Sequence, residues 1–301
     1  MMGAAGEADA TWLEVALNGP WGPAAQPRAP VTVADCIAEG VACAKAGAAI
    51  IHVHAFDPET GRQNDDWQTY ARIIEGIRDA VDAIVYPTLP FNGAAGHGGG
   101  LDVAARYAHT VELATRGLIE WSVVDPGTVQ IADFDRIADD RPGFVYSNPE
   151  DHVREGLRLA GRYGFHPGYA IYEPGFLRFG AALAQRYPDA PRALYRFMFS
   201  DRFSFGFPPR EWALASYIEL LRECAPGAPW MVAGLQVDIT GLIPAAVAAG
   251  GHVRVGLEDA VLGLERGNIA LAEDAAALIH RAGGRLADAA TVRRMARGAA
   301  D

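Results

Sequence analysis

The strongest constraint on the fold is a regular alternation of short β-branched runs with longer Ala- and Leu-rich amphipathic stretches, from Trp12 to about residue 282. This alternation is typical of parallel βα units. We expect eight strands, at residues 12–19, 48–55, 83–89, 119–125, 168–173, 195–200, 230–235 and 252–258. The helices are expected to begin near Thr32, Asp66, Leu101, Asn148, Gly175, Pro209, Asp238 and Asn268.

Strands that are each followed by a helix predict an α/β protein with the (β/α)8 TIM barrel fold, as a single domain over residues 1–301 with a short helical tail after Arg285. No GxGxxG run follows the first strand, which disfavours an open dinucleotide-binding sheet. The active site of a barrel lies at the C-terminal ends of its strands. Two long segments, residues 92–100 and 203–209, are either surface loops or lids over that end.

Composition restricts the partners of the chain. With 26 Lys and Arg against 37 Asp and Glu, its net charge of −11 argues against a nucleic-acid surface. Cys36, Cys43 and Cys224 have no paired spacing, which predicts free thiols and a reducing cytoplasmic compartment. The N-terminal residues lack the pattern of a signal peptide, and no apolar run reaches the length of a membrane span. We therefore expect a cytoplasmic protein without a membrane partner.

Two histidines lie close together in the second expected strand. Side chains alternate along a strand, so His52 and His54 share one face, while Ile51 and Val53 share the other. In a barrel the apolar face meets the helices, and both imidazoles point inward near the C-terminal end. Their nitrogens can then reach one metal ion at about 2 Å. A pair of hydrogen-bonded core histidines is the alternative interpretation.

The eighth expected strand adds a carboxylate to this site. Arg254 and Glu258 lie on its inward face, because Val253 and Val255 occupy the outward face. Glu258 can complete a three-ligand site that leaves coordination open for water or substrate, as a catalytic divalent metal such as zinc requires. An inward salt bridge between Arg254 and Glu258 is the simpler alternative.

Four runs resemble the β-keto acid cleavage enzyme family, namely GGHVRVGLED (residues 250–259), HVHAFDPETGR (residues 52–62), LNGP (residues 17–20) and DPGT (residues 125–128). The resemblance spans nearly the whole chain. It implies a zinc-dependent barrel enzyme, usually a homotetramer, with a small-molecule β-keto acid and acetyl-CoA as substrates. The transferase reaction would give acetoacetate and a new acyl-CoA.

The resemblance also implies residue roles. It makes His52, His54 and Glu258 the metal ligands, and it makes Arg254 and Asp259 catalytic. We expect Arg254 to bind the substrate carboxylate bidentately. For Asp259 we expect either a general base, kept ionised by two nearby cations without a raised pKa, or a hydrogen bond to a metal-binding histidine.

Three further residues are candidate substrate contacts. Thr88 is the nearest match to a hydroxyl residue that the family carries at the end of the third strand. Asn18 lies in the LNGP run, and Glu173 is the last residue of the fifth expected strand. For Glu173, capping the next helix is an equal alternative.

The residues around the expected mouth suggest the substrate tail. The aminohexanoate-cleaving members of the family carry an acid after the first strand, where this chain has Pro20 and Trp21. Phe91, Phe205 and Phe207 are expected to overhang the mouth. Burying an unpaired ammonium costs several kcal/mol, so we expect a β-keto acid with an uncharged or apolar tail.

Two other functions stay open. A metal-dependent hydrolase of the amidohydrolase type also carries His-x-His on a barrel strand, but needs further histidines on strands five and six. Here His166 precedes the fifth expected strand, and the sixth has none. A non-catalytic ligand-binding barrel would show neither metal nor turnover.

Overall fold

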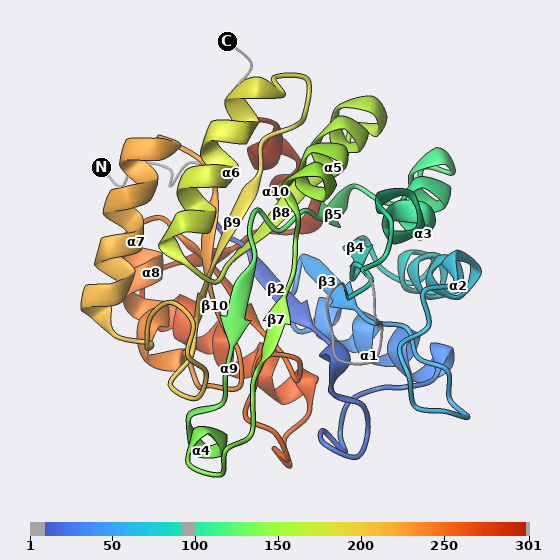
Figure 1. Ribbon diagram of the computed structural model, residues 1–301. Coiled ribbons are helices and arrows are strands. Elements are labelled where there is room, and N and C mark those ends of the chain that lie inside the picture. The colour runs from blue at the N-terminus through green and yellow to red at the C-terminus, as the bar shows by residue number, and fades with distance from the viewer. Residues whose placement is uncertain (1–9, 92–99, 299–301) are drawn as a thin grey trace, which may run out of the picture.

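The computed structural model describes residues 10–91 and 100–298, and it shows a parallel eight-stranded barrel surrounded by helices (Figure 1). The hydrogen-bonded order is β4-β3-β2-β11-β10-β9-β8-β5. The end strands β4 and β5 lie side by side, although no ladder joins them in the described part of the chain. The (β/α)8 prediction is confirmed. The barrel strands are β2 (Leu13–Ala16), β3 (Ile50–Val53), β4 (Ile84–Pro87), β5 (Trp121–Val123), β8 (His166–Ile171), β9 (Leu194–Phe199), β10 (Trp230–Gly234) and β11 (His252–Val255).

Helices cover the outside of the barrel (Figure 1). They are α1 (Val33–Lys45), α2 (Trp67–Arg78), α3 (Val103–Thr115), α5 (Glu150–Tyr163), α6 (Pro174–Arg186), α7 (Glu211–Cys224), α8 (Ile243–Ala248) and α9 (Asn268–Arg281). Thr32 and Asp66 cap α1 and α2 as expected, because each side chain accepts a backbone N–H of the first turn. The expected start near Asp238 is wrong, since the 3-10 turn η3 (Thr240–Leu242) precedes α8.

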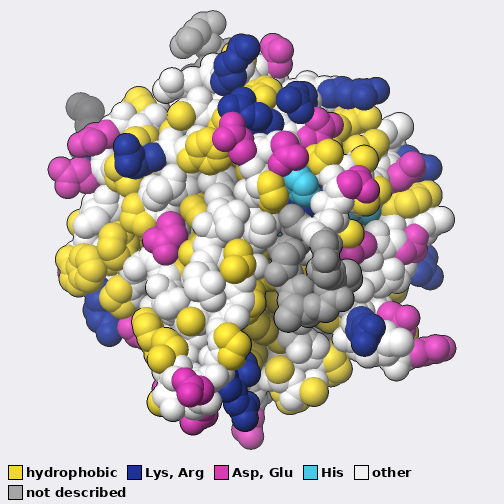
Figure 2. Space-filling view, in the orientation of Figure 1, with side chains coloured by type: hydrophobic (Ala, Val, Ile, Leu, Met, Phe, Trp, Pro, Cys, Tyr) yellow, Lys and Arg dark blue, Asp and Glu magenta, His cyan; other side chains and the backbone are white. Residues whose placement is uncertain are grey.

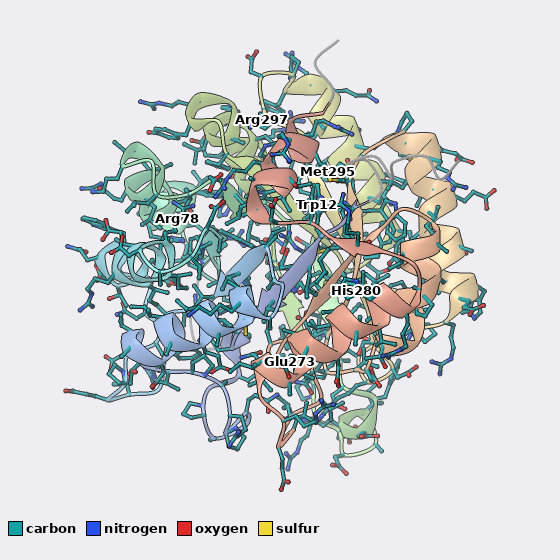
Figure 3. All side chains as sticks on the ribbon, turned by 180° about the vertical axis from the view of Figure 1, so that it is seen from behind. Trp12, Arg78, Glu273, His280, Met295 and Arg297 are labelled. Atoms are coloured by element: carbon teal, nitrogen blue, oxygen red, sulfur yellow. The ribbon has the colours of Figure 1, made fainter. Side chains whose placement is uncertain are left out.

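The main core lies between the barrel and the helices. The outward side chains Ile51, Val53 and Val253 are fully buried there, as period-two alternation predicts. A second apolar cluster fills the barrel at the N-terminal ends of the strands and includes Trp12 and Trp121. The predicted tail is helix α10 (Ala289–Arg297), which closes this end: Trp12 Nε1 donates to Met295 Sδ at 3.2 Å (Figure 3). Beside it, β1 (Ala10–Thr11) pairs with β12 (Arg285–Leu286).

Helix α10 also bridges the seam between β4 and β5. Arg293 donates to Glu120, just before β5, at 2.6 Å, and to Asp82, just before β4, at 2.8 Å. Arg78 of α2 donates to Glu120 at 2.9 Å as well. Ion pairs therefore join the two strands at the end of the barrel where α10 packs.

An unpredicted hairpin follows β5. It consists of β6 (Val129–Ile131), α4 (Phe134–Ile137) and β7 (Phe144–Tyr146), and it lies in front of the barrel in Figure 1. Tyr146 ties it to the barrel, because its hydroxyl donates to Asp125 Oδ2 at 2.5 Å. Of the two expected lids, residues 203–209 fold back along β9 and touch the hairpin through a bridge between Asp133 and Phe203. Residues 92–99 of the other lie outside the described residues.

No helix among residues 10–91 and 100–298 is long and apolar enough to cross a membrane.

Candidate metal centre

His52, His54 and Glu258 converge at the C-terminal ends of two strands that flank β2. His52 lies in β3, His54 follows that strand directly, and Glu258 follows β11. Their ligand atoms all lie within 4.8 Å of one another. His52 Nε2 lies 3.4 Å from Glu258 Oε2, and His54 Nε2 lies 3.5 Å from Glu258 Oε1.

The chemistry of these atoms fits a divalent cation. His54 Nε2 and Glu258 Oε2 are buried and have no hydrogen-bond partner among the described residues. Buried polar atoms without partners are costly, and a cation would satisfy both. Burial lowers the pKa of His52 to about 3, so its imidazole is neutral and keeps a lone pair. Two imidazole nitrogens and one carboxylate oxygen are a donor set that zinc accepts in catalytic sites.

Arg254 organises the carboxylates beside this centre. Its Nη2 lies 3.0 Å from Glu258 Oε1, and its Nη1 donates to Glu14 at 3.2 Å. Its Nε and Nη2 donate to the two oxygens of Asp259, each at 2.8 Å. Arg254 and Glu258 therefore form the salt bridge that was the simpler alternative. Glu258 nevertheless also converges with His52 and His54. The bidentate fork, expected to hold a substrate carboxylate, holds Asp259.

Asp259 is almost fully buried, and its environment differs from the expectation. Burial raises the pKa of Asp259 to about 6, although the ion pair with Arg254 opposes that rise. The expectation of an unraised pKa is wrong, because desolvation outweighs the neighbouring positive charge. The carboxylate lies behind Arg254 and does not line the cavity above the candidate centre.

A buried ion pair that was not predicted from the sequence lies below the centre. Glu14 is fully buried and accepts hydrogen bonds from Arg196 at 3.0 Å and from the Tyr86 hydroxyl at 2.6 Å. Burial alone would raise the pKa of Glu14, yet the charges of Arg196 and Arg254 lower it. The available signal was Arg196 itself, a charged residue on the inward face of an otherwise apolar strand.

A cavity opens above the candidate centre. Thr88, Pro20, Trp21 and Phe91 line it, as predicted. Its lining also includes residues that were not predicted, namely Asp125, Ile131, Phe144, Tyr146, Tyr172 and Arg196. In Figure 2 the basic side chains on this side of the molecule lie mostly toward its edge, among acidic ones, and hydrophobic side chains lie between them.

Phe205 and Phe207 were expected at the mouth, but neither lines the cavity. Phe205 packs edge-on against Tyr172, with ring centroids 4.9 Å apart, and Phe207 packs on Tyr217. The expectation is wrong because residues 203–209 fold back along β9, where Ser200 N donates to Phe207 O. The hairpin takes their place at the mouth.

Asn18 and Glu173 have partners within the protein. Asn18 donates from Nδ2 to the carbonyls of Pro30 and His54, both at 2.8 Å, and accepts the N–H of His54 at 2.9 Å. Glu173 accepts the N–H of Gly206 at 3.2 Å and gives α6 no side-chain cap. Neither residue lines the cavity, so their contacts favour positioning roles over substrate contact.

Comparison with known proteins agrees with the motifs. The family model described as BKACE, beta-keto acid cleavage enzyme, matches residues 10–297. The 3-oxoadipate:acetyl-CoA acetyltransferase of Cupriavidus necator is 28% identical over 279 residues, which cover 89% of this chain and 87% of the relative. The 3-dehydrocarnitine:acetyl-CoA trimethylamine transferase of Rhizobium meliloti is 27% identical over 286 residues, 88% of each chain.

A third relative, the 3-keto-5-aminohexanoate cleavage enzyme of Fusobacterium nucleatum, is 26% identical over 237 residues, 78% of this chain and 76% of the relative. Among solved structures, the apo structure of ObcA aligns with a TM-score of 0.71 at 18% identity. The alignment covers 89% of this chain and 65% of that of ObcA, so this chain spans about two thirds of its length. At this identity the likeness concerns the fold.

Proposed function

The chain belongs to the β-keto acid cleavage enzyme family, and from this premise we propose that it reacts a β-keto acid with acetyl-CoA at the centre formed by His52, His54 and Glu258. The convergence of these three side chains within 4.8 Å carries the proposal. The names of the two acetyl-CoA-dependent relatives support the choice of co-substrate.

The reaction exchanges acyl groups without loss of atoms. The bond between the α-carbon and the keto carbon of R–CO–CH2–COO⁻ breaks, and a bond forms between that α-carbon and the acetyl carbonyl of CH3–CO–S–CoA. The R–CO group passes to the sulfur of coenzyme A. The products are acetoacetate and R–CO–S–CoA.

His52, His54 and Glu258 would hold the metal, for which we propose zinc. When bound there, it would polarise the keto oxygen and stabilise negative charge as the carbon–carbon bond breaks. His52 suits this role because burial keeps its imidazole neutral. Arg254 would hold Glu258 in place through their 3.0 Å contact.

The other charged residues divide between orientation and proton transfer. Asp259 is the candidate base, because burial raises its pKa to about 6, near the range in which a general base works best. Arg254 would orient it through two parallel hydrogen bonds. Asp259 does not line the cavity, so it would give up one of these hydrogen bonds to reach the substrate. Thr88 and Arg196 line the cavity, and we assign them the substrate carboxylate. Glu14 already accepts from Nε and Nη2 of Arg196, so the substrate would meet the remaining nitrogen, Nη1.

We propose an uncharged or apolar tail for the substrate. Trp21, Phe91, Phe144 and Tyr146 supply aromatic surface to the cavity. Apart from the candidate metal ligand Glu258, Asp125 is the carboxylate among the described residues of this lining. Its oxygens already accept the Tyr146 hydroxyl and the N–H of Ala170. A cationic tail would have to compete with these two bonds.

Neither β8 nor β9 carries a histidine at its C-terminal end, where the hydrolase alternative needs one. His166 is the first residue of β8, at the end of the strand away from the centre, and its Nδ1 lies 2.9 Å from the Arg192 carbonyl.

We also propose a cytoplasmic homotetramer. The three cysteines are free, which suits a reducing compartment, and light scattering would measure the assembly.

Screening β-keto acids with acetyl-CoA tests the function. Metal-loaded protein should form acetoacetate and acyl-CoA in equal amounts, and chelation should stop the reaction. His54→Ala should lose both metal and activity, whereas His280→Ala, on the exposed surface of α9 (Figure 3), should keep both. Full stoichiometric metal in His54→Ala, or release of free acetate in place of acetoacetate, would contradict the proposal.

A further inference from the structure

The loop after β3 brings Gln63 back beside His54. Phe56 and Gln63 form an antiparallel bridge, and the backbone N–H of Asn64 donates to Ala55 O at 2.8 Å. Asp57 N donates to Arg62 O at 2.9 Å, which closes the turn between them. Gln63 therefore reaches the cavity wall on a braced loop.

A chain of two hydrogen bonds runs from His54 to a carboxylate. Gln63 Oε1 lies 3.0 Å from His54 Nδ1, and Gln63 Nε2 donates to Asp65 Oδ1 at 2.7 Å. An ionised carboxylate only accepts hydrogen bonds, so the amide nitrogen of Gln63 must face Asp65. The amide oxygen then faces His54, and Nδ1 of His54 must carry the proton.

This chain leaves the lone pair of His54 on Nε2, the atom that lies 3.5 Å from Glu258. Asn18 already fixes the backbone of His54, because it binds both the N–H and the carbonyl of that residue. Gln63 therefore adds control of the orientation and the tautomer of the imidazole ring. His52 has no such partner, since its Nδ1 lacks a hydrogen bond among the described residues.

We propose that Gln63 is a positioning residue that holds His54 in the Nδ1–H tautomer, with Nε2 presented to a metal, and that Asp65 sets the orientation of the Gln63 amide. The inference rests on the proposed metal-binding function of His54. An acceptor behind a metal-binding imidazole fixes its tautomer and raises its basicity, and loss of such a partner costs roughly 10–100-fold in metal affinity.

Zinc affinity, measured by competition with a chromophoric chelator, tests the role. Gln63→Leu should bind zinc roughly 10–100-fold more weakly than the wild type. Gln63→Glu keeps an oxygen acceptor for His54 but cannot donate to Asp65. Combined with Asp65→Asn, whose amide can donate to the new carboxylate, it should restore most of the affinity. Gln185→Leu makes the same change on the exposed face of α6 and should have no effect.

A second readout needs no metal. In metal-free protein with ¹⁵N-labelled histidine, NMR should show His54 as the Nδ1–H tautomer in the wild type and in the double variant Gln63→Glu with Asp65→Asn. In Gln63→Leu, and to a smaller degree in Asp65→Ala, it should show a mixture. Wild-type zinc affinity and an unchanged tautomer in folded Gln63→Leu would overturn the inference. If the wild type shows the Nδ1–H tautomer of His54 but binds no zinc, that result would contradict the proposed function and not the role of Gln63 in fixing the tautomer.

Discussion

Glu14 compensates two buried guanidinium groups below the candidate centre, and Glu14→Gln removes that charge while keeping the shape of the side chain. Arg254 would still have Asp259 and Glu258 as partners at 2.8 and 3.0 Å. Arg196 would lose the carboxylate that accepts its Nε and Nη2, and it is 2% exposed. Breaking a buried pair by removing one partner costs about 3–5 kcal/mol. We therefore expect Glu14→Gln to lower the free energy of unfolding by about 3–5 kcal/mol.

Urea denaturation of the wild type and of Glu14→Gln measures this difference. Glu112→Gln is the matched control, because its pair with Arg116 is a surface pair with side chains 46% and 41% exposed. Such a pair contributes about 0–1 kcal/mol. A loss in Glu14→Gln no larger than that of the control would refute the view that Arg196 depends on Glu14.

The same pair predicts a pH dependence. Arg196 and Arg254 together lower the pKa of Glu14 below its ordinary value of 4.5, against the opposing effect of burial. A carboxyl with a depressed folded-state pKa stabilises the protein fully above its unfolded pKa, and loses that contribution as the pH falls through the folded pKa. The difference between the wild type and Glu14→Gln should therefore shrink as the pH falls below about 4.5. A difference that stayed constant would contradict this assignment.

Three further changes test other parts of the structure. Arg254→Lys should fold but lose about a hundredfold or more in kcat/KM. One ammonium cannot hold Asp259 by two parallel hydrogen bonds and also hold Glu258. A variant that lost stability but kept its activity would show that the role of Arg254 is structural. Arg293→Ala should lower the free energy of unfolding by about 1 kcal/mol in urea, since it removes the ion pairs across the β4–β5 seam; no change would mean that apolar packing alone closes the seam. Phe144→Ala should raise KM for β-keto acids with a long apolar tail more than for those with a short tail. In the wild type, a higher kcat/KM for an amino-bearing β-keto acid than for a matched apolar one would contradict the proposed tail.

The features that sequence analysis predicted best depend on short-range periodicity. The inward position of His52 follows from alternation along β3, and His54, directly after that strand, keeps the same period. Glu258 was predicted by the same rule, but β11 ends at Val255 and Gly256 turns the chain, so alternation along the strand does not account for its position. Their convergence follows from barrel topology, which places the first strand between those two. The outward apolar residues of β3 and β11 were predictable for the same reason.

Contacts between distant segments were not predictable in this way. Glu14 and Arg196 are 182 positions apart, and each alone reads as an anomalous charge in an apolar strand. The hairpin strands have three residues each, too few to show a period, and the hairpin is attached through the contact between Tyr146 and Asp125. Arg254 was correctly placed on the inward face, but its partner depends on side-chain geometry that spacing does not determine.

The fate of the substrate carboxyl carbon distinguishes acyl exchange from decarboxylation and from hydrolysis. Metal-loaded wild-type protein would receive unlabelled acetyl-CoA and a β-keto acid that carries ¹³C in its carboxylate, and NMR would follow the label. We expect the label in the carboxylate of acetoacetate, with an equal amount of unlabelled acyl-CoA. Label in carbon dioxide or in free acetate would show decarboxylation or hydrolysis, and would contradict acyl exchange at this site.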